Sequence, residues 1–176
     1  MDSSIMDIIV SIVLPIINTT MIFITCWFII LQVIEMRRTT HAQAYGIARE
    51  ILQDEKVRAA RKTIFNLGEK ATSLNNWTQD EIRAAEIVCH TYDTVGQMIR
   101  NKLLPIKYII DSWGPSLRKS WPIVSPLVIK DRDKWDAIEA WDDYEWLFIK
   151  ATKLDTKRRK CKIRLEKIKS IFISQL

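Results

Sequence analysis

The sequence predicts an all-α protein with one N-terminal transmembrane helix and a cytoplasmic helical bundle. Residues 8–34 form a run of 27 residues without a charged side chain, and about 20 helical residues cross the hydrocarbon core of a bilayer. The 176-residue chain has only 4 glycines and is rich in good helix formers, a composition typical of helical proteins. We expect a transmembrane segment (1–36), a cytoplasmic helical domain (37–152) and a basic amphipathic C-terminal helix (153–176).

The apolar segment is predicted to remain attached to the chain as a membrane anchor. A signal peptide has basic residues before its apolar run and a small-residue cleavage site behind it. Here the run follows Asp2 and Asp7 and precedes Glu35, Arg37 and Arg38. Because basic residues favour the cytoplasmic side of a membrane, the arginine pair predicts a single-pass protein with its N-terminus outside and its C-terminal domain in the cytoplasm.

A polar stripe runs along the predicted span. Its members follow one another every seven residues, which keeps them on one slowly drifting helix face: Ser4, Ser11, Asn18, Thr25 and Gln32. In hydrocarbon such groups need partners, so Ser11, Asn18, Thr25 and Gln32 are predicted to face other helices or line a shared channel. The alternative is that they bond back to their own helical turn. Proline is tolerated at the first helical turn, so Pro15 leaves open whether the helix begins there or near Ile8.

The sequence has few signatures of an enzyme. Its three cysteines are odd in number and far apart, and it has two histidines, so we expect reduced thiols and neither a metal site nor a cofactor. It contains no phosphate-binding glycine loop, nucleophile elbow or dinucleotide fingerprint. Most enzyme classes therefore lose their usual signature.

Three helices are predicted between the membrane and residue 104. The first covers residues 35–54 and either continues the membrane helix or closely follows it, and the second covers residues 55–67. The third begins after Thr78, which forms a capping box with Glu81, and runs to about Leu104. On this third helix, residues spaced by three and four form an apolar core face: Ile82, Ala85, Cys89, Tyr92, Gly96, Ile99 and Leu103.

A polar face runs along the same helix, consisting of Arg83, Glu86, His90, Asp93, Gln97 and Arg100. Arg83 and His90 are separated by two helical turns, roughly 10 Å along the axis. A histidine can move the proton of a ribose 2′-hydroxyl, and an arginine can stabilise charge on the scissile phosphate. Arg83 and His90 are therefore candidate catalytic residues, and the alternative is a solvated or interface face.

Residues 105–150 hold five tryptophans: Trp113, Trp121, Trp135, Trp141 and Trp146. We expect a helix end and restart at 111–115, a break or kink at Pro122 and Pro126, and a helix over 134–152. Filling the core is the favoured role of the tryptophans. An oligomer interface, stacking on bases and contact with a membrane surface remain alternatives.

The last segment is strongly basic. Residues 153–169 hold nine basic residues and two acidic ones, a net charge of +7 in a chain of +6, so the rest of the chain sums to −1. The predicted basic surface consists of Lys157, Arg158, Arg159, Lys160, Lys162 and Arg164. A basic amphipathic helix can lie on an anionic leaflet, bind RNA phosphates, or pack by its apolar side with its charges in water.

The Arg83 to His90 pair resembles the motif of the HEPN superfamily of helical ribonucleases, in which an arginine and a histidine a few residues apart meet their counterparts across a dimer. Ala84 departs from the polar residue that usually follows the arginine. Together with the span and the basic C-terminal helix, the pair makes the whole chain resemble the small membrane accessory proteins of type VI-B CRISPR loci. Residues 41–49 and 85–93 are also similar to a wider family of bacterial single-span proteins of unknown function.

This resemblance implies a divergent HEPN-like helical domain on a protein of the bacterial inner membrane. It implies a ring-like homo-oligomer, such as an octamer, that acts as a pore and dissipates the membrane potential to strengthen antiphage defence. The implied functional partner is an RNA-guided RNase effector with its guide RNA, and direct RNA binding is a further expectation. Arg83 and His90 then serve assembly or modulation. The alternatives are a membrane-tethered HEPN ribonuclease and a passive membrane scaffold for the effector.

Overall fold

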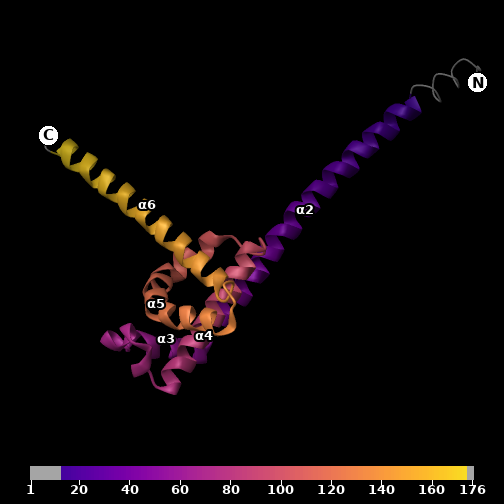
Figure 1. The fold of residues 1–176 in the computed structure, drawn as a ribbon. Helices are drawn as coiled ribbons and strands as arrows, with labels where there is room; N and C mark the ends of the chain where they lie inside the picture. The colour runs from indigo at the N-terminus through magenta and orange to yellow at the C-terminus, as the bar shows by residue number, and fades with distance from the viewer. Residues whose placement is uncertain (1–12, 174–176) are drawn as a thin grey trace, which may run out of the picture. The chain divides into compact units, whose positions relative to one another are not determined.

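The computed structural model describes residues 13–173, with the side chains of 69, 72 and 167–173 left undescribed. Over this range the chain is helical and contains no strand, so the predicted all-α class is confirmed (Figure 1). The elements are α2 (Leu14–Gln53), α3 (Glu55–Phe65), the 3₁₀ helices η2 (Gly68–Thr72) and η3 (Leu74–Asn76), α4 (Gln79–Arg100), α5 (Ile106–Trp135) and α6 (Asp142–Ile173).

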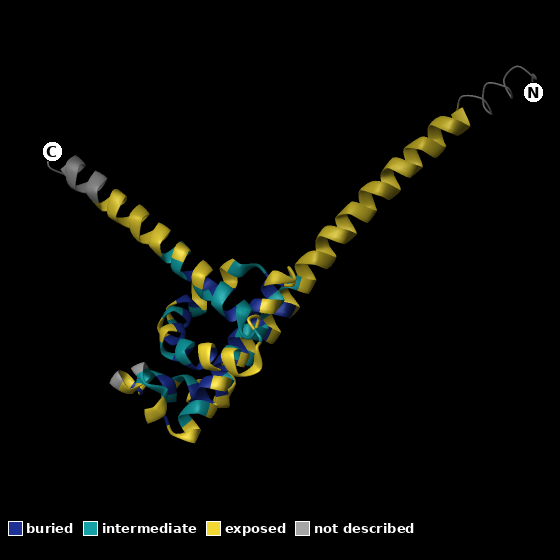
Figure 2. Ribbon diagram, viewed as in Figure 1, coloured by how far each residue is buried: buried dark blue, intermediate teal, exposed yellow. Residues whose placement is uncertain are grey.

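The chain forms two compact units, one ending at Ala42 and the other beginning at Gln43. The first contains most of α2, whose most apolar stretch has no buried residue (Figure 2). Within residues 13–173, α2 is the one helix that is long and apolar enough to cross a membrane. Length and composition of this kind are shared by membrane spans and signal sequences.

The second unit is a helical bundle built around α4. The predicted core face of α4 is buried at five of its positions, Ala85, Cys89, Tyr92, Gly96 and Ile99. Ile82 is half-buried, and Leu103 lies beyond the helix and is 42% exposed, so the core prediction fails there. Ala84, Val88 and Val95 are buried as well, because α4 packs against both α3 and α6 and also touches α5. Its buried surface is therefore wider than the single predicted stripe.

Local hydrogen bonds set the two ends of α4. The predicted capping box is confirmed: the Thr78 hydroxyl accepts from the Glu81 N–H at 3.3 Å, and the Thr78 N–H donates to the Glu81 carboxylate at 2.6 Å. The hydrogen bond from the Thr78 N–H to the carboxylate favours its charged form and lowers the pKa of Glu81. The helix ends at Arg100 instead of near Leu104, because Lys102 adopts a left-handed φ of 59°.

The predicted helix end at 111–115 and the predicted break at Pro122 and Pro126 are wrong, whereas the alternative of a kink at these two prolines stays a prediction. α5 is one helix that contains Pro115, Pro122 and Pro126. Pro126 has no N–H for the Pro122 carbonyl, and the Ser125 hydroxyl donates to that carbonyl at 3.3 Å instead. One side of α5 is buried in the bundle, and this packing stabilises the helix against the destabilising effect of its prolines.

The predicted helix over 134–152 is confirmed from Asp142 onward, but its predicted start is wrong, because a turn separates α5 from α6. Asp136 and Trp141 take left-handed φ values of 50° and 63°. Arg132 spans this turn by donating from Nε to the Ala140 carbonyl at 2.9 Å and by pairing with Glu145 at 2.9 Å. α6 then continues without a break through residue 153.

The tryptophans between residues 105 and 150 do not share one role. Trp121 is buried, as predicted for the core, and its ring packs on Tyr144 and Phe148. Trp113, Trp141 and Trp146 are half-buried against the core. Trp135 is 56% exposed at the end of α5, so the core prediction fails there.

Candidate functional site

Only some side chains in the polar stripe of α2 form hydrogen bonds to their own helix. Thr25 donates its hydroxyl to the Met21 carbonyl at 2.8 Å, which is the own-turn bond of the alternative interpretation. Asn18 and Gln32 are exposed, and their amides make no hydrogen bond within residues 13–173. Ser11 lies outside the described residues. Asn18 and Gln32 are therefore members of the stripe whose side chains do not bond to their own helix.

The spacing of these two amides fits the dimensions of a membrane. Asn18 and Gln32 are 14 residues apart, which is about 21 Å along a helix and within the roughly 30 Å of a hydrocarbon core. Fourteen residues bring the helix back to nearly the same face, with a drift of about 40°. One copy of α2 thus carries two exposed amides on nearly the same side, about 21 Å apart along the helix.

Arg83 and His90 occupy the exposed side of α4. Arg83 makes no ion pair or hydrogen bond in the part of the chain that the structure describes. The His90 ring lies edge-on to Trp141, with ring centroids 6.3 Å apart at 69°. Ala84, the residue after Arg83, is buried in the core of the bundle. One chain therefore presents an accessible arginine and histidine, without a third group fixed between them.

The other half of the polar face of α4 holds the start of α6. The Asp93 carboxylate accepts the Tyr144 N–H at 3.1 Å, satisfying one of the free N–H groups in the first turn of α6. Burial raises the pKa of Asp93 even though this hydrogen bond favours its charged form. Arg100 pairs with Asp142 at 2.7 Å and with Asp143 at 2.9 Å. These side chains bind α6 and are not part of an open site.

Gly96 makes this close approach of α4 and α6 possible. A Cβ atom at position 96 would lie 2.5 Å from the Asp143 carbonyl oxygen. The α4–α6 contact was missed from the sequence, although two signals pointed to it. They are a glycine inside a helix, which often has a packing reason, and the acidic pair Asp142-Asp143, which is typical of a helix start.

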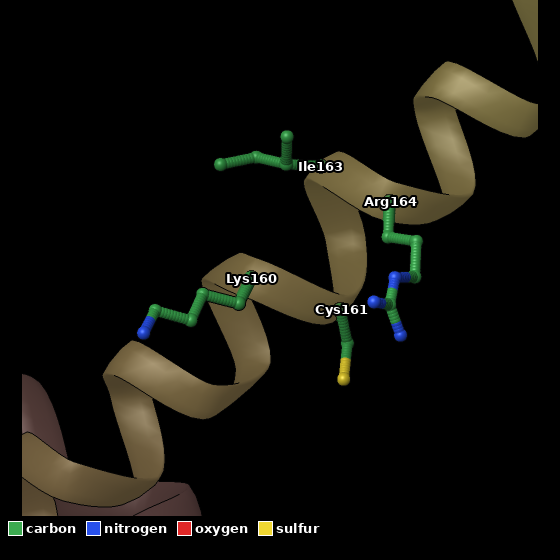
Figure 3. A pocket seen from close by; sticks show the side chains of 4 residues that line it. All are labelled: Lys160, Cys161, Ile163 and Arg164. Carbon is green, nitrogen blue, oxygen red and sulfur yellow. The ribbon is translucent and has the colours of Figure 1, made fainter.

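The predicted basic surface lies on the exposed C-terminal part of α6. Near the bundle, Arg158 pairs with Asp111, and Arg159 pairs with Asp155 at 2.8 Å. Within the described residues, the other four members have no ion pair: Lys157, Lys160, Lys162 and Arg164. Figure 3 shows an open hollow on this helix, where the side chains spread outward from a single element instead of converging. It offers no enclosed site for a small ligand.

The cysteines do not form a reactive or metal-binding group. Burial raises the pKa of the Cys89 thiol far above its ordinary range, so this residue is an inert part of the core. Cys26 and Cys161 are exposed, and all three thiols are free. Among residues 13–173, no three histidine, cysteine or carboxylate side chains gather in a way that could hold a metal ion.

Comparison with known families places the chain. A family model described as a domain of unknown function, DUF4760, matches residues 16–151. The chain belongs to the DUF4760 family. The matched region includes Asn18 and Gln32 on α2 and Arg83 and His90 on α4, and it ends before the basic surface of α6. No curated protein and no solved structure matches the chain.

Proposed function

We propose that this DUF4760 protein is a homo-oligomeric pore of a bacterial inner membrane that strengthens RNA-guided antiphage defence by depolarising the membrane. The observation that carries the pore is the pair of exposed amides, Asn18 and Gln32, on nearly the same side of a largely apolar, exposed stretch of helix. An amide without a hydrogen bond costs roughly 4–8 kcal/mol in pure hydrocarbon. Neighbouring copies of α2, or water in a channel that they enclose, remove this cost.

A ring of copies gives each amide a defined role. Because Asn18 and Gln32 face the same side of α2, a ring in which this side points inward has one circle of asparagine amides and another of glutamine amides about 21 Å away. The opposite side of α2 is rich in Ile, Leu, Val and Phe and suits lipid. The Arg37-Arg38 pair supports a cytoplasmic position for the bundle.

The link to defence rests on the resemblance to type VI-B CRISPR accessory proteins. It supplies the partner, an RNA-guided RNase effector with its guide RNA, and the expectation that the pore opens when the effector is triggered. In cells, the test is membrane potential with and without an activated effector. Depolarisation only when the effector is activated supports the proposal. Depolarisation that is the same with and without an activated effector contradicts the proposal that the effector opens the pore.

Conduction through the stripe is tested in vesicles that contain the purified protein. Asn18→Leu and Gln32→Leu together should lower ion flux at least tenfold, with normal insertion. Thr20→Leu is the matched control, because Thr20 lies on the opposite side of α2 and its hydroxyl bonds to the Ile16 carbonyl at 2.8 Å. Wild-type flux in the double variant, or equal loss in Thr20→Leu, would refute the inward placement of the stripe.

A membrane-tethered ribonuclease is the second candidate, favoured by the exposure of both Arg83 and His90. His90 would move the proton of the ribose 2′-hydroxyl, and Arg83 would stabilise the phosphate. In this case His90→Ala abolishes RNA cleavage by the purified protein, whereas Glu86→Gln, an exposed change between the two, leaves it intact. A passive scaffold, the third alternative, requires neither flux nor cleavage.

A further inference from the structure

The apolar side of α6 packs on the bundle and then runs past it. Tyr144, Leu147 and Ala151 are fully buried, and Leu154 is half-buried against the core. They follow the three-and-four spacing that keeps residues on one face of a helix. From residue 156 to residue 166 every side chain is exposed, as the change of colour along α6 in Figure 2 shows. We call residues 156–173 the α6 extension.

The same spacing continues along the α6 extension, where the side chains of 156–166 are exposed. The next positions are Arg158, whose ion pair with Asp111 marks the edge of the bundle, then Cys161 and Leu165. Leu165 is 59% exposed. In the sequence the pattern goes on to Ile168 and Phe172. A strip of apolar positions therefore extends beyond the bundle for several turns of helix.

Basic side chains flank this strip on both sides. At about 100° per residue, Lys157 and Arg164 fall roughly 60–80° to one side of it, and Lys162 falls about 80° to the other. Long basic side chains beside an apolar strip can lay their methylene stems on lipid and place their charges at the headgroups. This arrangement is typical of helices that lie in the interface of an anionic membrane.

The charge of the α6 extension excludes a second copy of itself as a good partner. Residues 153–169 carry +7, and two such helices packed along their strips would bring like charges together. Asp155 cannot relieve this, because it is already paired with Arg118 at 3.2 Å and with Arg159. The strip needs a partner that is both anionic and apolar.

We infer that the α6 extension lies on the anionic surface of the lipid bilayer. An anionic leaflet offers negative headgroups to the lysines and arginines and acyl chains to Cys161 and Leu165, whereas a polynucleotide offers phosphates and nothing for the strip. Each basic residue near such a surface is attracted to it electrostatically. The inference rests on the membrane anchoring in the proposed function, which raises the local concentration of lipid, and does not require the pore.

The test uses full-length protein with Cys26→Ser, labelled at Cys161 with a polarity-sensitive fluorophore. Cys89 is buried and stays unlabelled. The protein is reconstituted in vesicles of phosphatidylcholine alone or with phosphatidylglycerol. We expect a blue shift and at least threefold protection from acrylamide, an uncharged quencher, in the anionic vesicles only. Leu165→Asp should abolish both effects. Ile163→Asp is the control, because Ile163 is similarly exposed, at 64%, and points away from Cys161 (Figure 3).

Other outcomes overturn the inference and identify what is wrong. Equal quenching in both kinds of vesicle, or equal effects of the two aspartate variants, would contradict the proposed contact with lipid. Cys161–Cys161 crosslinking in phosphatidylcholine vesicles assigns the strip to a second copy, and protection produced there by added RNA assigns it to a polynucleotide. Flotation of the vesicles reports membrane anchoring separately. If the protein floats with the vesicles but the quencher still reaches the label at Cys161, this inference alone is refuted. If the protein does not float, the anchoring is refuted as well.

Discussion

Replacing Gly96 by alanine tests the contact between α4 and α6. The added Cβ would lie 2.5 Å from the Asp143 carbonyl oxygen, 2.8 Å from the Asp143 carbonyl carbon and 3.0 Å from its Cβ. Two of these atoms are backbone, so α6 must shift as a whole and strain the Asp93 and Arg100 bonds. Overpacking costs about 1–3 kcal/mol or more, against a gain in helix propensity of about 1 kcal/mol. Because the clash is with backbone atoms, the overpacking cost should lie in the upper part of this range, and we expect a net destabilisation of about 1–2 kcal/mol.

Gly46→Ala is the matched control for this substitution. Gly46 is an exposed residue of α2, and a Cβ there meets no atom within 4 Å. The same chemical change should therefore stabilise the protein by about 0.5–1 kcal/mol. Both variants are unfolded with urea in detergent micelles and followed by circular dichroism. If Gly96→Ala is as stable as Gly46→Ala, the close approach of α4 and α6 is incorrect.

Three more properties of the bundle can be measured. Burial raises the pKa of the Cys89 thiol, so a maleimide should label Cys161 in the folded protein and reach Cys89 only on unfolding; prompt labelling of both, seen by peptide mass spectrometry, contradicts this burial. Ser120→Ala leaves the buried Tyr144 hydroxyl without its 2.6 Å partner and should cost about 1–3 kcal/mol in urea unfolding, much of it recovered by adding Tyr144→Phe; an additive double variant counts against the bond. Burial raises the pKa of Asp93, so its contribution to stability is complete below the unfolded pKa of about 3.9 and declines as pH rises through the folded pKa. Asp93→Asn should flatten that decline in the unfolding free energy, and an unchanged pH profile would refute it.

Local patterns were enough to predict the helical class and the long apolar helix. The capping box of Thr78 and Glu81 depends only on residues three apart, and the core face of α4 depends on spacing alone. The course of α5 was mispredicted, because proline rules describe an isolated helix. Here the Ser125 hydroxyl replaces a missing donor, and burial holds the helix together. Neither effect is visible in the local pattern.

The division of the polar face of α4 could not be predicted, because it depends on residues far apart in the sequence. Asp93 bonds to a backbone group 51 residues away, and Arg100 to a carboxylate 42 residues away. A periodic pattern shows that six polar residues share a face, but it does not show which of them contact another helix. Arg83 and His90 remain exposed because α6 begins beyond them, next to Trp141.

The pore and the ribonuclease both require assembly, so loss of assembly cannot distinguish them. One chain offers a single Arg83 and a single His90 about 10 Å apart along α4, and a compact catalytic centre needs a second copy to bring another pair close. If the polar stripe of α2 drives assembly, substitutions in this stripe abolish ion flux and RNA cleavage together. His90→Ala leaves that stripe intact, so it should abolish cleavage in a ribonuclease while assembly persists. Persistent depolarisation in this variant would separate the pore from any chemistry at α4.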